Sequence, residues 1–331
     1  MDLSTTYLGL KLPHPFMPGA SPLVDDLDMV RRLEDAGAAA IVMHSLFEEQ
    51  IAREQVASFL HTEMHGESFA EAMFYFPNAD RFAFGPEEYL QHLARVKAAV
   101  DVPVIASLNG TTLGGWLDYA TAMEQAGADA LELNVYALPS DPEQNALAIE
   151  DLTLEMLATL KRKLHIPVAV KLSPFYTAPL HFARRLDSAG AAGLVLFNRF
   201  YQPDIDVDGL HVSRQLALSS SAELPLRLRW LAILSGNLHA SLAVRGGVHT
   251  AQDAIKAVMA GADAVQMVSA LLREGPECLA RVRAETVAWM QERHYESLSQ
   301  MRGSMNMYSC PDPSAYERAN YMLLLQSWKR A

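Results

Sequence analysis

The sequence predicts an α/β fold of the TIM (β/α)8 barrel class, and repetition within the chain is the main reason. A helix end, a glycine turn and an apolar run recur in EDAGAAAIVMHS, EQAGADALELNV, DSAGAAGLVLFN and MAGADAVQMVSA. The glycine of each turn suits the left-handed position just past a helix, and the apolar run is typical of a buried parallel strand. A second kind of boundary places proline before a strand, in VDVPVIASLNG and LHIPVAVKLSP, where it removes no central ladder hydrogen bond.

Eight strands and eight helices follow from these boundaries. With PFMPGAS and HASLAVRGG added, the predicted strands end near residues 20, 45, 109, 136, 173, 199, 245 and 270. The helical patterns between them are long enough for right-handed crossovers, and they cover 24–37, 86–99, 115–127, 143–164, 178–189, 225–236, 250–261 and 274–294. A doubly wound sheet is the structural rival, but PFMPGASPLVDD lacks the GxGxxG turn that normally follows its first strand.

The predicted barrel occupies residues 1–294, and residues 295–331 form a C-terminal helical extension. The extension carries the amphipathic stretch AYERANYMLLLQSW, which we expect to pack on the barrel or on a dimer partner. Two connections are longer than usual, 46–85 and 200–224. Both follow strands and therefore lie on the catalytic face of a barrel, so we expect long βα loops that act as lids there.

Composition limits the partners. Half of the 331 residues are hydrophobic, and a formal net charge of -12 with a pI near 5.4 argues against nucleic acid or an anionic membrane as a partner. The two cysteines, Cys278 and Cys310, have no CxxC spacing, so neither a disulfide framework nor an iron–sulfur cluster is expected. We find no signal-peptide pattern and no membrane-spanning apolar stretch, and we expect a cytoplasmic protein that acts on a small molecule and holds no metal.

The stretch LELNVYALP brings polar residues to one predicted strand end. Strand alternation turns Glu132, Asn134 and Tyr136 toward the barrel interior, and the same rule turns Lys171 inward in VAVKLS. A lysine and an asparagine at adjacent strand ends would be costly in an apolar barrel without partners. They could simply satisfy one another, but a functional role is favoured because catalytic groups of these barrels lie at this end of the strands.

A phosphate site is predicted near the last two strands. Gly246 and Gly247 follow a strand and precede a helix in AVRGGVHTAQDA, which exposes backbone N–H groups suited to an anion. Ser269, in MVSALLREGP, can donate a further hydrogen bond. Loops after strands seven and eight commonly hold phosphate in this fold.

Together these stretches resemble the FMN-dependent dihydroorotate dehydrogenase family, over nearly the whole chain. The resemblance rests on LGLKLPHPFMPGAS, ELNV, VKLSP, LFN, GGVHTAQDAIKAVMAGADAVQMVSAL and REGP. It implies FMN as cofactor, oxidation of dihydroorotate to orotate in pyrimidine biosynthesis, and a homodimer of the cytosolic type. It also implies cofactor contacts: a phosphate held by Gly246, Gly247 and Ser269, an isoalloxazine lined by Ala20 and Ser45, Lys171 at the flavin N1/O2 edge, and Asn134 and Asn198 on flavin and substrate.

The chain departs from this family where the substrate is expected. The family motif Asn-x-Ser-Cys-Pro-Asn, or its serine variant, supplies a base that removes the substrate proton, and the matching residue here, Ala137, cannot accept one. His44 stands where the cytosolic branch usually has lysine, and a substrate-binding asparagine is matched only by Pro77-Asn78. We therefore expect a changed substrate, with Tyr136 or His44 replacing the base by virtue of its place at a strand end.

Two other functions stay open on the sequence alone. The missing base also fits a non-catalytic flavin-binding partner of another redox enzyme. Less favoured is a Schiff-base aldolase barrel in which Lys171 is the nucleophile. The electron acceptor is undetermined: a quinone is disfavoured by the N-terminal sequence, and a separate electron-transfer partner would be needed for any iron–sulfur route.

Overall fold

The computed structural model describes residues 1–53, 85–213, 216–318 and 320–327, and at its centre lies an eight-stranded parallel sheet. Its end strands β3 and β4 also lie beside each other, so the sheet closes into the predicted TIM barrel. The neighbours in order are β3 (Phe16–Pro18), β12 (Ala264–Met267), β11 (Ser241–Arg245), β8 (Gly193–Leu196), β7 (Val168–Leu172), β6 (Ala130–Asn134), β5 (Val104–Asn109) and β4 (Ile41–Phe47). Each strand ends within a few residues of its predicted end.

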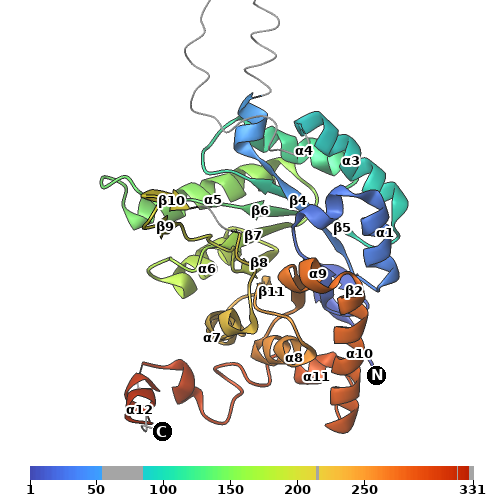
Figure 1. Ribbon diagram of the computed structural model, residues 1–331, viewed down its shortest axis with the longest axis vertical. Coiled ribbons are helices and arrows are strands. Elements are labelled where there is room, and N and C mark those ends of the chain that lie inside the picture. The colour runs from blue at the N-terminus through green and yellow to red at the C-terminus, as the bar shows by residue number, and fades with distance from the viewer. Residues whose placement is uncertain (54–84, 214–215, 319, 328–331) are drawn as a thin grey trace, which may run out of the picture.

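Helices connect the strands and surround the barrel (Figure 1). They are α1 (Leu27–Asp35), α3 (Pro86–Ala99), α4 (Tyr119–Gln125), α5 (Ala146–Lys163), α6 (Pro179–Ser188), α7 (Leu224–Leu234), α8 (Ala251–Ala260) and α10 (Glu277–Glu292). Short helical turns η1 (Pro22–Asp25), η3 (Gly115–Asp118) and α9 (Ser269–Glu274) precede three of them. The repeated glycine turn behaves as predicted, since Gly127 and Gly190 follow α4 and α6 with φ of 100° and 92°.

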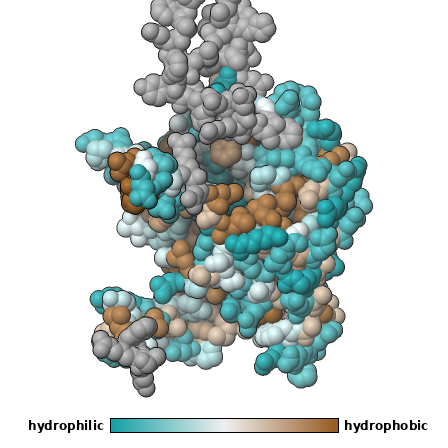
Figure 2. All heavy atoms as spheres, in the orientation of Figure 1, coloured by the Kyte–Doolittle hydropathy of each residue, from teal (hydrophilic) through white to brown (hydrophobic). Residues whose placement is uncertain are grey.

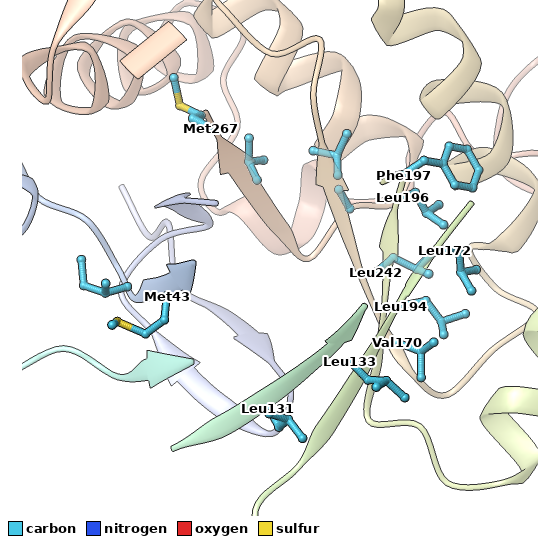
Figure 3. Packing of buried hydrophobic residues seen from close by; sticks show 14 of the residues in the cluster. Met43, Leu131, Leu133, Val170, Leu172, Leu194, Leu196, Phe197, Leu242 and Met267 are labelled. Atoms are coloured by element: carbon cyan, nitrogen blue, oxygen red, sulfur yellow. The ribbon is translucent and has the colours of Figure 1, made fainter. Parts of the chain in front are cut away.

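The core has two layers, as strand alternation requires. The outer layer lies between the strands and the helices, where Leu131, Leu133 and Val170 project from β6 and β7 (Figure 3). The inner layer is built from small side chains such as Ala169 and Ala243. An N-terminal hairpin of β1 (Thr5–Tyr7) and β2 (Leu10–Leu12) contributes buried apolar residues to this inner layer. Polar side chains lie beyond this apolar inner layer, toward the C-terminal ends of the strands.

Of the two predicted lids, only one falls within the described chain. Most of 46–85 lies outside the described residues, as does the Pro77-Asn78 match. The connection 200–224 contains an antiparallel hairpin, β9 (Asp204–Asp206) with β10 (His211–Ser213), and the turn η4 (Ser221–Glu223). Ile205 and Val212 are among its exposed apolar residues, and Figure 2 shows brown surface on this hairpin at the upper left.

The C-terminal extension packs on the barrel only in part. The helix α11 (Leu298–Met301) buries Leu298 and Met301, and the backbone N–H of Met305 donates to the carbonyl of Met259 in α8. Beyond the turn η5 (Pro313–Tyr316), the helix α12 (Asn320–Ser327) has no buried residue and lies apart from the barrel, at the lower left of Figure 1. Within the described ranges, no helix combines the length and the apolarity that a membrane crossing needs.

Candidate functional site

A cavity of 660 Å³ opens at the C-terminal ends of the strands. Residues from seven different strand ends meet there, although they are far apart in the sequence. Seven of the predicted site residues line it: Ala20, His44, Ser45, Asn134, Tyr136, Lys171 and Asn198. The structure thus brings together in one cavity the groups that sequence reasoning assigned to the isoalloxazine and to catalysis.

His44 and Ser45 both reach the cavity because β4 carries one extra residue. Val42 pairs with Ile105 of β5, but the next partners are Ser45 and Ser107, so β4 spans three residues where β5 spans two. A bulge of this kind re-aims side chains, and without it two consecutive residues would face opposite sides. The Ser45 hydroxyl is hydrogen-bonded to that of Ser107, with 2.8 Å between the oxygens.

Lys171 of β7 is fully buried and forms an ion pair inside the barrel with Glu132 of the neighbouring strand β6. Its Nζ donates to Oε1 of Glu132 at 2.6 Å, while Nε2 of Gln266 donates to Oε2 of the same carboxylate at 2.8 Å. Burial lowers the pKa of Lys171 to about 8, helped by the charge of Arg245 and opposed by Glu132. Burial alone would raise the pKa of Glu132, but the charge of Lys171 and the two hydrogen bonds outweigh it and the pKa is lowered. Since the carboxylate is held ionised, we treat Lys171 as its cationic partner.

The two asparagines contact each other although β7 lies between their strands, since Asn134 ends β6 and Asn198 follows β8. Nδ2 of Asn198 donates to Oδ1 of Asn134 at 2.7 Å, and both side chains are buried. The bond fixes both amide orientations and leaves the Nδ2 of Asn134 directed as a donor elsewhere. Tyr136 lies beside them and stacks on Phe200, with ring centroids 4.3 Å apart.

Ala137, which the sequence predicts to stand where the family has its base, does not line this cavity. It lies with Leu138 and Pro139 on a neighbouring cavity of 370 Å³, whose wall also includes Phe200. The residue that follows Tyr136 is therefore directed away from the strand-end cavity as well as being chemically inert. Both predicted candidates for proton transfer, His44 and Tyr136, line the strand-end cavity.

The predicted phosphate residues do not line this cavity: Gly246 and Gly247 directly follow Arg245, which does line it, and Ser269 begins α9 after β12. Gly246 and Gly247 both have φ of 81°, and a Cβ on Gly247 would come within 2.7 Å of the backbone nitrogen of Leu224. Only glycine fits this close approach. The helix α8 that follows is capped by its own Thr250, whose side chain accepts from the N–H of Asp253.

Sequence reasoning missed Ser219, which joins the two phosphate loops. Its backbone N–H donates to Oγ of Ser269 at 3.0 Å, and its own Oγ accepts from the N–H of Gly247 at 3.4 Å. The Oγ of Ser219 also lies 3.3 Å from Nε2 of His249. The run LSSSAE gave the signal, since three serines directly before a helix offer anion-binding hydroxyls.

Two arginines of the cavity were also missed. Arg245 directly precedes the glycine pair, is partly buried, and donates from Nη2 to the carbonyl of Ala20 at 2.8 Å. Arg199 follows Asn198 and pairs with Glu223 at 3.1 Å. Within the described chain, Nε of Arg245 and Nη1 of Arg199 are buried without a hydrogen-bond partner, which is costly unless a ligand supplies an acceptor.

These residues fit a flavin mononucleotide. The cavity has the size of a ligand site, it offers buried N–H donors that lack acceptors, and it holds a cation at Lys171. The glycine loop beside it leaves no room for a Cβ, as expected where backbone closely approaches other groups. The donor set is cationic and amide-rich, which suits a phosphate and a ring with several carbonyl groups.

The barrel with polar groups at its strand ends defines an enzyme of the TIM-barrel class. A sequence profile of the family described as dihydroorotate dehydrogenase matches residues 83–290, more than half of the chain. The protein therefore belongs to the dihydroorotate dehydrogenase family. This membership places it among the oxidoreductases related to dihydroorotate dehydrogenase.

Curated relatives match over most of the chain at modest identity. The dihydroorotate dehydrogenase B (NAD(+)) catalytic subunits of Thermoplasma acidophilum and Thermoplasma volcanium are 27% and 28% identical over 311 and 310 residues, which in both cases is 91% of this chain and 98% of the relative. The NAD-dependent dihydropyrimidine dehydrogenase subunit PreA of Escherichia coli is 26% identical over 329 residues, 92% of this chain and 77% of the relative. Relatives that match similar lengths of this chain are thus named for different substrates, dihydroorotate and dihydropyrimidine.

Proposed function

We propose that the protein is an FMN-dependent oxidoreductase that acts on a CH–CH group of a small substrate. The observation that carries the proposal is the strand-end cavity, where buried Lys171, Asn134 and Asn198 lie beside the glycine loop. Bound FMN would supply hydride transfer at its N5 atom. The family membership and the unpaired N–H groups of Arg199 and Arg245 support the same cofactor.

In this proposal each part of the cavity has a separate task. The N–H groups of Gly246 and Gly247 and the hydroxyl of Ser269 bind the phosphate. Lys171, held by Glu132, places a fixed positive charge next to the ring, where it stabilises an anionic reduced cofactor. Asn134 and Asn198 orient flavin and substrate through their linked amides, and Ala20 and Ser45 line the ring.

We propose further that the substrate is not dihydroorotate. Ala137 offers no proton acceptor and lies on a different cavity, so the proton transfer of the family reaction has lost its usual group. His44 and Tyr136 lie in the strand-end cavity instead. A role in pyrimidine biosynthesis would follow only if dihydroorotate were turned over.

The visible spectrum of the purified protein tests the cofactor, and anaerobic screening then tests the substrate. We expect a yellow protein whose flavin is released as FMN on denaturation. Among dihydropyrimidines, dihydroorotate and other small CH–CH compounds, we expect bleaching by a compound other than dihydroorotate. Bleaching by dihydroorotate at a rate typical of the family would refute the changed substrate, and a colourless protein that does not bind added FMN would refute the cofactor.

The same experiments separate the two alternatives. Full flavin retention without turnover of any compound would favour a non-catalytic flavin-binding subunit. Covalent trapping of a carbonyl compound on Lys171 by borohydride would favour the aldolase. We expect no trapping, because Nζ of Lys171 lies 2.6 Å from Glu132 inside the barrel.

We propose a homodimer in the cytoplasm, with a separate electron-transfer partner as the second candidate association. A partner is supported by the names of two relatives, because the Thermoplasma acidophilum protein is named as a catalytic subunit and the Escherichia coli protein as a subunit. Sedimentation of the purified chain tests the dimer, and flavin reoxidation with and without cell extract tests the need for a soluble carrier.

A further inference from the structure

The bulge in β4 brings His44 next to a carboxylate that sequence reasoning did not single out. Oδ1 of Asp25 lies 2.5 Å from Nδ1 of His44, and the two side chains are only 24% and 16% exposed. Asp25 ends the turn η1 that follows β3, and it lines the same cavity as His44. The pair therefore joins two strand ends at the edge of the cavity.

Helix α3 holds both members of this pair in place. The hydroxyl of Tyr89 donates to the carbonyl oxygen of His44 at 2.9 Å, and its ring meets the imidazole edge-on with centroids 5.0 Å apart. One turn further on, Nε2 of His92 lies 2.6 Å from the carbonyl oxygen of Val24, the residue before Asp25. A side chain fixed from several sides loses little further freedom when it reacts.

A carboxylate beside one ring nitrogen decides which tautomer a neutral histidine adopts. Asp25 stabilises the form with the proton on Nδ1, so Nε2 is the basic nitrogen. Among the described residues, Asp25 in η1 and Tyr89 in α3 are titratable groups that face His44, while β5 presents the neutral Ser107. Lys171, Arg199 and Arg245 line the remainder of the cavity.

We propose that His44 is the acid–base group of this site and that Asp25 is its positioning residue. The proposal rests on the proposed flavin function. In the oxidative direction Nε2 of His44 would accept a proton from one carbon of the substrate, bound FMN would supply the acceptor for the hydride of the adjacent carbon, and a C=C bond would form between them. In the reverse direction the imidazolium returns the proton. Tyr136, stacked on Phe200, then packs over the site without accepting a proton.

Nitrogen-15 NMR of the histidine side chains tests the tautomer with or without a substrate. His44 is assigned by the signal lost in His44→Gln. We expect the proton on Nδ1 in the wild type and a shift toward the other tautomer in Asp25→Asn. The matched control is Asp26→Asn, which changes the next carboxylate, an exposed helix cap that asparagine can replace. A wild-type proton on Nε2, or no change in Asp25→Asn, would overturn the positioning role.

Single-turnover bleaching of the flavin, with whichever compound the screen identifies, tests the proton transfer. We expect His44→Gln to lower the rate about 100-fold or more and Asp25→Asn about 10-fold or more, while FMN content and the flavin reduction potential stay at wild-type values. Full activity in His44→Gln, or loss in Tyr136→Phe instead, would overturn the proposal. A wild-type protein without flavin would refute the proposed cofactor. The NMR experiment would still test whether Asp25 sets the tautomer of His44.

Discussion

Lys171 and Glu132 form an ion pair that is buried on all sides, with exposed fractions of 1% and 0%. Lys171→Met would leave the carboxylate buried without this partner, and we expect a loss of about 3–5 kcal/mol in the free energy of unfolding. The double variant with Glu132→Gln removes the stranded charge and should recover most of that loss. Urea unfolding of both variants measures the difference, and equal stability of the single and double variants would contradict the charge argument.

Gly247 allows a second prediction about single residues. Gly247→Ala places a Cβ within 2.7 Å of the Leu224 backbone at a φ of 81°, so the loop must shift. We expect weaker FMN binding by about 10-fold or more, because one or more N–H bonds to the phosphate are lost.

Gly9→Ala is the matched control for Gly247→Ala, since Gly9 has φ of 77° and no atom within 4 Å of the added Cβ. The control variant should lose about 1–2 kcal/mol of stability from backbone strain and keep its FMN affinity. Flavin fluorescence titration measures both affinities. Equal affinities in the two variants would place the phosphate elsewhere.

At the scale of elements, α12 differs from the other α-helices of the described residues in having no buried residue. Its run of exposed apolar residues, with Tyr321 at 66% and Leu324 at 60%, would be costly as free surface. Since no side chain of α12 is buried against the barrel, a chain that ends at Arg318 should unfold at the same temperature as the full chain.

Differential scanning calorimetry of the truncated chain at low concentration checks this prediction. Truncation at Glu296 is the comparison, since it removes the buried Leu298 and Met301 as well and should lower the midpoint clearly. A large loss on truncation at Arg318 would mean that α12 is buried in solution, and sedimentation would then identify a second copy as the cover.

The two α3 residues that hold the His44 region illustrate how elements make a site. Tyr89 and His92 are three positions apart on α3, so they share one face of the helix and meet β4 and η1 together. Their polar atoms bond backbone carbonyls, which positions the strand end and the turn before any ligand arrives.

At the scale of the whole molecule, stability should depend on pH through the buried His14 at the base of the barrel. Burial lowers the pKa of His14 from 6.5 to about 4, and the charge of Arg283 adds to this effect. The unfolded chain therefore binds a proton more readily between those pH values, and stability falls as the pH drops from 6.5 toward 4. A shift of this size corresponds to about 3 kcal/mol.

The variant His14→Gln checks this dependence, because it removes the titrating group and keeps a hydrogen-bonding side chain. Its free energy of unfolding should change less than that of the wild type between pH 6.5 and 4. Parallel curves for the two proteins would show that other groups dominate the acid response.

The sequence by itself determined the barrel, because glycine turns, proline boundaries and apolar runs are local signals that each mark one strand. It also placed Asn134, Lys171 and Tyr136 on one face, since alternation in β6 and β7 is regular. The same local logic predicted the glycine loop after β11. These inferences needed no knowledge of which strands become neighbours beyond their order along the chain.

Tertiary structure alone decided the partners of these residues. The bulge in β4 put His44 beside Ser45 in the cavity, and closure of the barrel brought Asp25 within 2.5 Å of His44 and Gln266 onto Glu132. Contacts of this kind join residues separated by up to 134 positions, so their geometry depends on the register of every strand between them. A pattern along one strand contains no information about that register. The sequence therefore predicts which side chains point inward, and only the folded barrel determines which of them come into contact.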